Sequence, residues 1–571
     1  MIRNINARFP GTCITCSEPF PAGFLVAYNK ETRKCSHIDC SMRAAEATTE
    51  EAEEAREIAV SEAAKPAFVP SVYQQAVFDF IEHDHRNAFV SAVAGSGKTT
   101  TIVESLDLLQ GKEVLFLAFN KSIVTDLAGR VPAGAEVRTL NSFGHRTVLK
   151  YLEGKGRKGI KLETGKNLRN LIKAIAAEYV EPPLKSGEAP KTAIEAKEHL
   201  DAARDLAFRL ASLAKATLAD LTVEAEVFGL VDHYGLDANG ALPLATQFAL
   251  IALERSRQIG AAIDFDDQLY LPVVLKMPVQ QYQMILVDEA QDLSLVQMRL
   301  IAMALAPGGR IVAVGDRAQA IYGFRGADCY AVDRLIKEFS MIELPLSISY
   351  RCPKKVVALA KEFVPEIEAS DAAIEGEIFT AETDLEQEQI LARLTTGHMV
   401  LCRTNAPLVK ICFDLIRRGQ KAVMRGRDIG VGLTTLIKKI AGFTMHDFIE
   451  NLEIYRYEEC ARLNAAERPT EALEDKVDTI LALCDGVTST DDLVAKIKDI
   501  FSDQTIGVVC SSVHRAKGLE SQSIVIARPE LMPFPRASKD HEMIQERNLM
   551  YVAVTRSKQT LTLLGRGFGD I

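Results

Sequence analysis

The chain has 571 residues, of which 47% are hydrophobic and 25% charged, and its formal net charge is −10. These values are ordinary for a soluble globular protein of several domains, and no run of about 18 apolar residues is present that would span a membrane. The acidic balance weighs against a nucleic-acid partner without excluding one, because a groove can be positive on an acidic protein. The N-terminus has no apolar signal-peptide core and the cysteine count of 11 is odd. We therefore expect a reducing interior, the cytoplasm or a eukaryotic nucleus, and no membrane partner.

The first forty residues contain two close groups of potential metal ligands. Cys13 and Cys16 form a C-x-x-C pair, and Cys35, His37 and Cys40 follow. A zinc site needs four nitrogen or sulfur ligands, and so short a segment is too small for a hydrophobic core of its own. We predict a structural Zn²⁺ site formed by Cys13, Cys16, His37 and Cys40, with Cys35 as the rival fourth ligand and a β-hairpin between the two groups. The alternative is a set of unrelated thiols. A zinc module of this kind would bind DNA or a protein partner.

Beyond this segment, the pattern predicts a linker and then two α/β units. Residues 46–69 are acidic and typical of a solvated helical linker. From residue 70 onward, short apolar runs alternate with helical periodicity, as in parallel sheets covered by helices. The runs expected to form strands are 87–93, 113–119, 284–287 and 310–314 in the first unit and 399–402, 507–510, 523–527 and 560–563 in the second.

Two stretches with helical periodicity and no strand signal interrupt these units. They cover about residues 145–260 and 430–505. We therefore predict an α/β protein with a zinc-binding module at 1–45, a linker at 46–69, and two parallel-sheet domains at 70–345 and 346–571, each carrying one helical insertion.

A phosphate-binding loop is predicted between the first strand and the helix that follows it. The P-loop pattern has Gly where this chain has Ala92, but two later glycines allow backbone N–H groups to point inward. The helix N-terminus favours phosphate, Lys98 would reach the β- and γ-phosphates, and the Thr99 hydroxyl would bind Mg²⁺. The predicted nucleotide-binding residues are Ala94, Gly95, Ser96, Gly97, Lys98, Thr99 and Thr100.

Two adjacent acids, Asp288 and Glu289, follow the strand predicted at 284–287. Ligands bind at the C-terminal edge of such sheets. Asp288 would hold Mg²⁺, and Glu289 would orient and deprotonate the attacking water. Alone, such a pair is typical of a surface loop. Coupled to an upstream P-loop, it predicts ATP hydrolysis.

A later segment indicates more than nucleotide binding. Gln319 follows a strand and could sense the γ-phosphate. Tyr322 and Phe324 stand beside Arg325, a combination that suits stacking on unpaired bases. An isolated aromatic residue would more often be core packing.

Two arginines from the second unit complete the pattern. Arg351 follows the apolar run 342–346, and Arg556 lies near the end of the chain. Each alone would be typical of a surface salt bridge. Together we expect them to act as arginine fingers on the transition-state charge.

In this order, the segments resemble the motifs of superfamily 1 helicases of the UvrD/Rep type. AGSGKT resembles motif I, VDEAQD motif II, GDRAQAIYGFRGA motif III, SYR motif IV, HRAKGLE motif V and ERNLMYVAVTR motif VI. LAFNKSI and TLNSFGHR resemble motifs Ia and Ib, and DFDD resembles the short acidic motif before motif II. The resemblance covers about residues 70–571, and its wording is most similar to the F-box helicase subgroup.

The resemblance implies two RecA-like domains of the P-loop NTPase type and a role for each matched residue. The implied γ-phosphate contacts are Gln319, Arg351 and Arg556. The implied adenine and ribose contacts are Gln74 (with Gln75 as its rival), Tyr350 and Glu520. The implied DNA contacts are Phe119, Asn120, Thr139, Ser142, Tyr322, Phe324, Arg325 and His514. Phe324 stands where many relatives have Trp, a residue that this chain lacks.

The resemblance further implies an ATP-driven motor that moves 3′→5′ on single-stranded DNA and acts at single-strand/double-strand junctions. ATP and Mg²⁺ would lie between the two domains, and closure around them would drive each step. An alternative is a DNA-stimulated ATPase switch that recruits a partner through the zinc module without processive unwinding. An ATPase without a nucleic-acid role is a third reading, which motifs III and V disfavour.

Overall fold

The computed structural model of the chain describes residues 2–6, 11–12, 19–20, 25–29, 34–37, 68–119, 121–127, 132, 134–157, 161–162, 167–179, 193–236, 238, 240–260, 262–323, 330–440, 442, 444–465, 470–502, 507–535, 537 and 539–569. The chain divides into two compact units, Met1–Ser71 and Val72–Ile571.

The N-terminal unit contains short antiparallel strands. β4 (Leu25–Asn29) pairs with β1 (Ile2–Asn6) on one side and with β5 (Lys34–His37) on the other. β2 (Gly11–Thr12) pairs with β3 (Pro19–Phe20) and contacts β5. The β4–β5 pair corresponds to the expected hairpin, but its second strand already carries Cys35 and His37 of the second group of potential zinc ligands.

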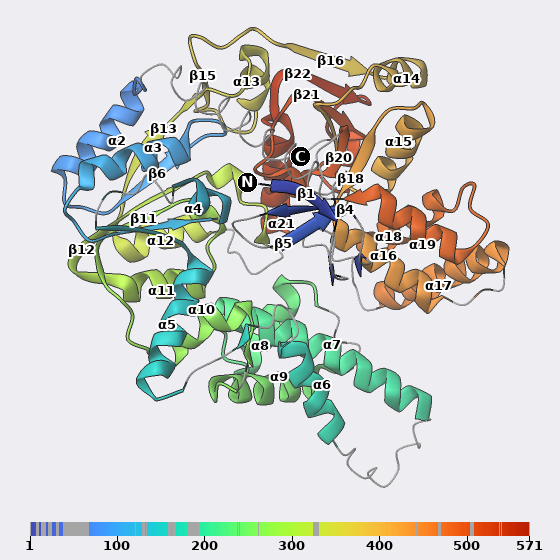
Figure 1. Cartoon of the computed structure of the whole chain (residues 1–571), viewed down its shortest axis with the longest axis horizontal. Helices are drawn as coiled ribbons and strands as arrows, with labels where there is room; N and C mark the ends of the chain where they lie inside the picture. The colour runs from blue at the N-terminus through green and yellow to red at the C-terminus, as the bar shows by residue number, and fades with distance from the viewer. Residues whose placement is uncertain are drawn as a thin grey trace. The chain divides into compact units, whose positions relative to one another are not determined.

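The first sheet of the second unit has six parallel strands in the order β13-β6-β12-β11-β7-β8 (Figure 1). Its inner strands are almost fully buried and apolar, because helices cover both faces. The strands are β6 (Ala88–Ala92), β7 (Val114–Ala118), β8 (Ala135–Thr139), β11 (Tyr282–Val287), β12 (Leu305–Gly315) and β13 (Ile342–Leu346). The helices around it are α2 (Val72–His83), α3 (Lys98–Ser105), α4 (Lys121–Leu127), α11 (Leu295–Ala304) and α12 (Ala331–Phe339).

The second sheet has seven parallel strands in the order β16-β22-β21-β17-β20-β18-β19. They are β16 (Glu377–Ala381), β17 (His398–Cys402), β18 (Ala422–Arg425), β19 (Phe501–Ser502), β20 (Val508–Ser512), β21 (Ser521–Ala527) and β22 (Ser557–Leu564). Helices α13 (Lys354–Ala360), α14 (Asp384–Ala392), α15 (Ala406–Arg417), α20 (Val513–Ala516) and α21 (Asp540–Val554) accompany it. A short parallel pair, β14 (Ile348–Ser349) with β15 (Glu368–Ala369), lies between the two sheets in sequence.

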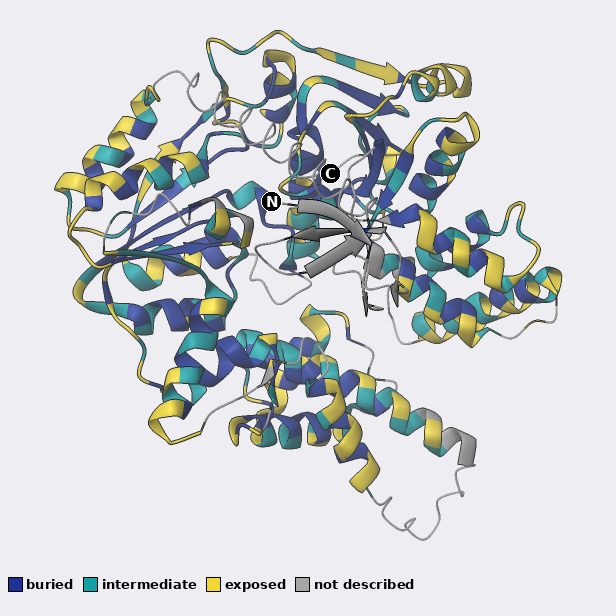
Figure 2. Ribbon diagram, viewed as in Figure 1, coloured by how far each residue is buried: buried dark blue, intermediate teal, exposed yellow. Residues whose placement is uncertain are grey.

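Helices fill the two stretches predicted to be insertions. The first contains α5 (Leu140–Gly154), α6 (Asn167–Glu178), α7 (Ala193–Thr217), α8 (Glu224–His233), α9 (Leu242–Arg257) and α10 (Phe265–Val274). The second contains α16 (Arg427–Lys439), α17 (Met445–Ala465), α18 (Glu471–Leu483) and α19 (Thr490–Ile500). The helices of the first insertion share a core of Leu, Ile, Ala and Phe side chains. Figure 2 shows the resulting pattern, with buried strands in both sheets and exposed outer faces on the helices.

The expectation of two parallel sheets is confirmed, and each of the eight predicted runs contributes a strand. Two details are wrong. No strand was expected within the helical stretches 145–260 and 430–505, yet β9 (Lys161–Leu162) lies in the first and pairs in parallel with β10 (Ala262–Ile263), and β19 lies in the second and pairs with β18. Ladders of two residues leave no periodicity to detect. Among the described residues, no helix has the length and apolar character needed to cross a bilayer.

Candidate active site

The loop between β6 and α3 has the conformation that a phosphate-binding loop needs. Gly95 and Gly97 have φ angles of 74° and 78°, in the left-handed region that glycine adopts without strain. Gly97 precedes Lys98, the first residue of α3, so the unpaired N–H groups of the helix N-terminus lie beside the loop. Ala92, which replaces the first Gly of the pattern, is the last residue of β6, where the extended backbone suits any residue.

Gln74 and its rival Gln75 lie in different environments. Gln74, on α2, is buried, and its Nε2 donates to Oγ1 of Thr101 on α3 at 3.1 Å. The Gln75 side chain is exposed and donates to Asp79 one turn along the same helix. Of the two, only Gln74 lies against the helix that begins at the phosphate loop.

The two acids after β11 lie next to the loop. Oγ1 of Thr99 donates to Oδ2 of Asp288 at 3.0 Å, so the two predicted Mg²⁺ ligands are adjacent. Burial and the neighbouring Glu289 charge raise the pKa of Asp288 to about 6. Burial also acts to raise the pKa of Glu289, but the charges of Lys98 and Lys517 more than offset this, and its pKa is lowered. Glu289 has a φ of 50°, a strained value for a residue other than glycine and one that recurs at functional sites.

A chain of hydrogen bonds connects the first sheet to Arg556. Nε2 of Gln319 donates to Oδ2 of Asp316 at 2.6 Å, and Oε1 of Gln319 accepts from Nη2 of Arg556 at 3.3 Å. Arg556 is 1% exposed, and it also donates to the carbonyl oxygens of Val552 (2.9 Å) and Leu519 (3.3 Å). Burial, followed by the nearby charge of Arg351, lowers the pKa of Arg556 to about 10. Within the described residues no carboxylate forms an ion pair with Arg556. Burial of this guanidinium therefore has a free-energy cost that a bound anion would offset.

Arg351 meets the phosphate loop directly. A Cβ placed on Gly95 would lie 2.6 Å from Cβ of Arg351, so no larger residue fits at that position. The backbone N–H of Tyr350 donates to the carbonyl oxygen of Gly95 at 2.9 Å, while the Tyr350 residue is 51% exposed. Nε of Arg351 donates to Oε2 of Glu520 at 2.6 Å, and Glu520 also pairs with Lys558 at 2.5 Å.

The phosphate loop, Glu289, Gln319 and the two arginines line one cavity of about 330 Å³, whereas Asp288, Tyr350 and Glu520 do not line it. Its lining residues are Gly95, Ser96, Gly97, Lys98, Thr99, Thr100, Phe119, Ile123, Glu289, Gln319, Tyr322, Arg351, Lys517, Gly518 and Arg556. Four of these carry positive charge against the single carboxylate of Glu289. Oγ of Ser96 is buried without a hydrogen-bond partner, as expected of a loop that receives an oxygen of a ligand. The donor set therefore fits a nucleotide polyphosphate, with Mg²⁺ at the adjacent oxygens of Thr99 and Asp288.

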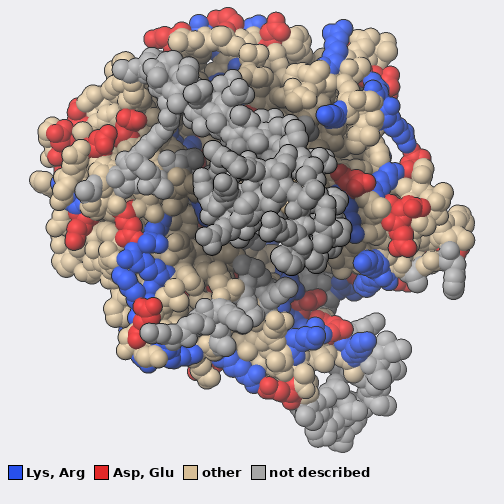
Figure 3. All heavy atoms as spheres, viewed as in Figure 1, with Lys and Arg blue, Asp and Glu red and all other residues tan. Residues whose placement is uncertain are grey.

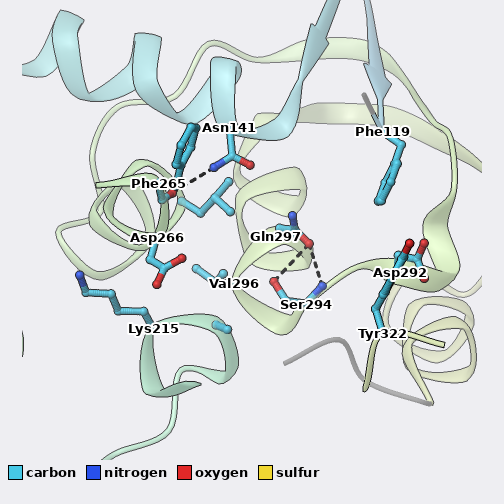
Figure 4. Close-up of a pocket in the computed structure, with 12 residues that line it drawn as sticks. Phe119, Asn141, Lys215, Phe265, Asp266, Asp292, Ser294, Val296, Gln297 and Tyr322 are labelled. Atoms are coloured by element: carbon cyan, nitrogen blue, oxygen red, sulfur yellow. Dashed lines mark hydrogen bonds between the residues drawn. The ribbon is translucent and has the colours of Figure 1, made fainter. Parts of the chain in front are cut away.

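A second cavity of about 480 Å³ adjoins the first and shares Phe119 and Tyr322 with it. We call it the aromatic groove. Figure 4 shows Phe119, Asp292 and Tyr322 gathered at one end, and Asn141, Phe265, Asp266 and Lys215 toward the other. Aromatic faces beside amide and charged groups are the features that bind unpaired bases and their phosphates. In the coloured part of Figure 3, basic and acidic side chains are interspersed, so a local groove rather than net charge has to attract a polyanion.

Three other predicted DNA contacts, Thr139, Ser142 and His514, line neither cavity. Oγ1 of Thr139 accepts from the backbone N–H of Ser142 at 3.2 Å and so caps α5. Asn141, between them in sequence, lines the groove, whereas they do not. The carbonyl oxygen of His514 accepts from the Tyr322 hydroxyl at 3.3 Å, which fixes a ring of the groove without exposing the histidine to it.

Several predicted residues cannot be placed. Asn120, Phe324, Arg325, Cys13, Cys16 and Cys40 lie outside the described residues. Cys35 and His37 belong to β5, of which only the backbone is described. Among the described side chains, no group of three or more potential metal-binding residues occurs.

Sequence reasoning missed several residues that line the two cavities or support them. The Tyr551 hydroxyl accepts from the backbone N–H of Ala94 at 2.9 Å and so supports the phosphate loop. Lys517 lines the nucleotide cavity, and Asp292 lines the groove. All three lie inside motifs that were recognised, so the motifs could have marked these residues as candidates, although not the partners that they contact. Lys215, in the middle of a helical stretch, carried no such signal.

Comparison with known families gives two matches in chain order. Residues 74–340 match the UvrD/REP helicase N-terminal domain, and residues 471–565 match the UvrD-like helicase C-terminal domain. These spans contain the phosphate loop, the two acids, Gln319, Lys517 and Arg556.

Individual relatives agree with these matches. F-box DNA helicase protein 1 of Schizosaccharomyces pombe is 22% identical over 509 residues, which cover 83% of this chain and 55% of the relative. DNA helicase II of Haemophilus influenzae is 33% identical over 93 residues, 16% of this chain and 13% of the relative. The ATP-dependent DNA helicase PcrA of Staphylococcus aureus is 30% identical over 120 residues, 19% and 16% of the two chains. The matched segment thus spans about half of the first relative and less of the others.

Proposed function

Because this chain belongs to the UvrD-like family of ATP-dependent DNA helicases, we propose that it hydrolyses ATP to move along single-stranded DNA and to separate strands or displace bound proteins. One observation carries the proposal. Lys98, from the part of the chain built around the first sheet, lines the same cavity as Arg351 and Arg556, from the part built around the second sheet. A nucleotide bound there would contact both of these parts at once, so its hydrolysis would change how the two parts are held together.

The residues of the cavity suit phosphoryl transfer to water. Lys98 and the loop N–H groups would bind the β- and γ-phosphates, and the lowered pKa of Glu289 keeps its carboxylate ionised to accept a proton from water. Bound Mg²⁺ at Thr99 and Asp288 would neutralise phosphate charge. Arg351 and Arg556 would stabilise the charge that develops on the transferred group. Gln74 is the better candidate of its pair for adenine, since it lies against α3.

The aromatic groove would bind the DNA strand. Phe119 and Tyr322 offer ring faces for bases, and both rings also border the nucleotide cavity. Hydrolysis of the bound nucleotide and the stacking of a DNA base would therefore both affect the Phe119 and Tyr322 side chains. Travel in the 3′→5′ direction is part of the proposal and rests on the family resemblance.

The test combines turnover with polarity. ATP hydrolysis by the full chain is measured with and without single-stranded DNA, and unwinding is measured on duplexes with a 3′ or a 5′ tail. We expect turnover to rise with DNA, Lys98→Ala to abolish it, and the 3′-tailed duplex alone to be unwound. DNA-stimulated turnover without unwinding would favour the ATPase switch, and turnover indifferent to DNA would refute the motor.

We also propose a structural zinc site in the N-terminal unit. β2 ends immediately before Cys13 and contacts β5, which carries Cys35 and His37, so one group of potential ligands begins where a strand ends and part of the other lies on a strand in contact with it. The purified chain should contain one zinc per molecule by elemental analysis. Replacing Cys13 and Cys16 with Ser should remove it, while Cys460→Ser on α17 should not. A chain free of zinc after metal-replete expression would refute the site.

A further inference from the structure

One ion pair stands between the nucleotide cavity and the aromatic groove. Lys517 lines the nucleotide cavity, and Asp292 lines the groove. Nζ of Lys517 donates to Oδ2 of Asp292 at 2.5 Å and to the carbonyl oxygen of Gln319 at 2.7 Å. The two side chains are only 6% and 3% exposed, so solvent barely screens their attraction.

Both partners of the pair have other interactions within reach. Oδ1 of Asp292 is buried without a hydrogen-bond partner, so the carboxylate is only half satisfied. Lys517 lies over the ring of Tyr322, with Nζ 4.9 Å from its centroid. The charge of Lys517 also helps to lower the pKa of Glu289 in the nucleotide cavity. Lys517 is therefore shared between an acid, an aromatic face and the phosphate side.

Both proposed ligands compete for these contacts. Asp292 and the carbonyl oxygen of Gln319 already take two of the three ammonium donors of Lys517, and a γ-phosphate in the cavity, which attracts the ammonium as a point charge, would draw Nζ away from Asp292. A base that stacks on Tyr322 competes with Lys517 for the face of the same ring. Either ligand thus favours release of Lys517 from Asp292, and the second ligand then binds without breaking the pair again.

We propose that Asp292 is a positioning residue that couples the two sites by holding Lys517 away from the nucleotide until DNA enters the groove. This inference rests on the proposed function, because it requires ATP in one cavity and DNA in the other. It assigns Asp292 no contact with reacting atoms. It predicts that DNA and nucleotide strengthen each other's binding by the same factor, as linkage requires.

The test is a thermodynamic cycle on the full chain. Dissociation constants are measured for a nonhydrolysable ATP analogue with and without an oligothymidylate strand, and their ratio gives the coupling factor. Asp292→Asn removes the charge while keeping the shape. We expect it to tighten analogue binding without DNA about fivefold, to leave DNA-bound affinity unchanged, and so to lower the coupling factor about fivefold.

The smaller variant Asp292→Ala should lower the coupling factor in the same way. Agreement between the two variants would show that the effect comes from loss of the carboxylate and not from the amide group of the introduced asparagine. Asp333→Asn, at an exposed acid on α12 that pairs with Arg317, should leave the factor at the wild-type value. A wild-type coupling factor in both Asp292 variants, or weaker analogue binding without DNA, would overturn the inference. A wild-type protein that binds both the analogue and the strand without coupling would also overturn the inference, whereas a wild-type protein that binds the analogue but no oligothymidylate would instead refute the proposed function.

Discussion

Arg556 is a buried cation that forms no ion pair with a carboxylate among the described residues. It is one of the largest fully buried side chains, and its guanidinium contacts carbonyl oxygens, a hydroxyl and Gln319 rather than an acid. Removing such a charge from water is expensive unless an anion compensates it. A γ-phosphate held by Lys98 would supply that anion, which is why burial here argues for catalysis rather than for stability.

At the same scale, Phe119→Ala tests the aromatic groove. Phe119 is 50% exposed, so its removal should leave the thermal midpoint unchanged. Loss of one stacking face is expected to weaken single-stranded DNA binding by about 5- to 150-fold, the equivalent of ~1–3 kcal/mol. Affinity is measured by fluorescence anisotropy. Phe228→Ala, at a similarly exposed ring (52%) on α8 outside both cavities, is the matched control, and equal losses in the two variants would remove Phe119 from the DNA site.

Motif chemistry identified the phosphate loop and its acids because each of these residues is tied to a strand end or a glycine turn. It could not identify partners that meet across the chain. Tyr551 reaches Ala94 from 457 residues away, and Lys517 reaches Asp292 from 225. No local pattern encodes such distances. The choice between Gln74 and Gln75 likewise depends on which side of α2 faces α3, and the ambiguous spacing left that open.

Among the elements, α7 and α10 are joined by a buried charge cluster. Nζ of Lys215, on α7, lies 2.7 Å from Oδ1 of Asp267 and 3.6 Å from Oδ2 of Asp264 at the start of α10. Burial acts to lower the pKa of Lys215, but the charges of Asp267 and Asp264 more than offset it, and the pKa is raised. Ser256 on α9 donates to Asp267 as well. The cluster thus joins three helices at the edge of the aromatic groove.

Lys215→Met should therefore loosen this part of the insertion. Removing the cation leaves buried acids uncompensated, at a cost of about 3–5 kcal/mol. We expect hydrogen exchange, followed by mass spectrometry, to show reduced protection of the backbone amides in α7 and α10. The double variant Lys215→Met, Asp267→Asn should regain part of this protection. Lys173→Met, on the exposed face of α6, is the control, and protection in α10 that stays at the wild-type level in Lys215→Met would contradict the anchoring role.

The elements most open to prediction were those with a single strong signal. Buried central strands such as β7 and β11 appear in the sequence as unbroken apolar runs. Edge strands such as β8 and β16 are half-buried or exposed, and their mixed sequences gave no such run. Lys215 had the spacing of a solvated lysine on an amphipathic helix, so its burial could not be foreseen without its acidic partners.

For the second unit as a whole, the central feature is that one cavity draws on both parallel sheets. Gly95 leaves no room for a side chain because Arg351 packs on it, and Tyr551 on α21 supports the same loop. The first insertion also contacts α21. Lys539 donates to Asp232 of α8 at 2.8 Å, and the rings of His233 and His541 stack with centroids 4.5 Å apart. Movement of one sheet against the other would therefore displace residues of the nucleotide cavity and helices of the first insertion.

The most direct measurement is the turnover number for ATP, at saturating single-stranded DNA, of Arg556→Lys beside wild type and Arg547→Lys. Arg547 lies on the exposed side of α21 and donates to the carbonyl oxygen of Glu362, so its replacement controls for a change of arginine on that helix. We predict that Arg556→Lys binds a nonhydrolysable ATP analogue yet turns over ATP about a thousandfold more slowly, whereas Arg547→Lys matches wild type. Turnover by Arg556→Lys within threefold of wild type would contradict a nucleotide site completed by the second sheet.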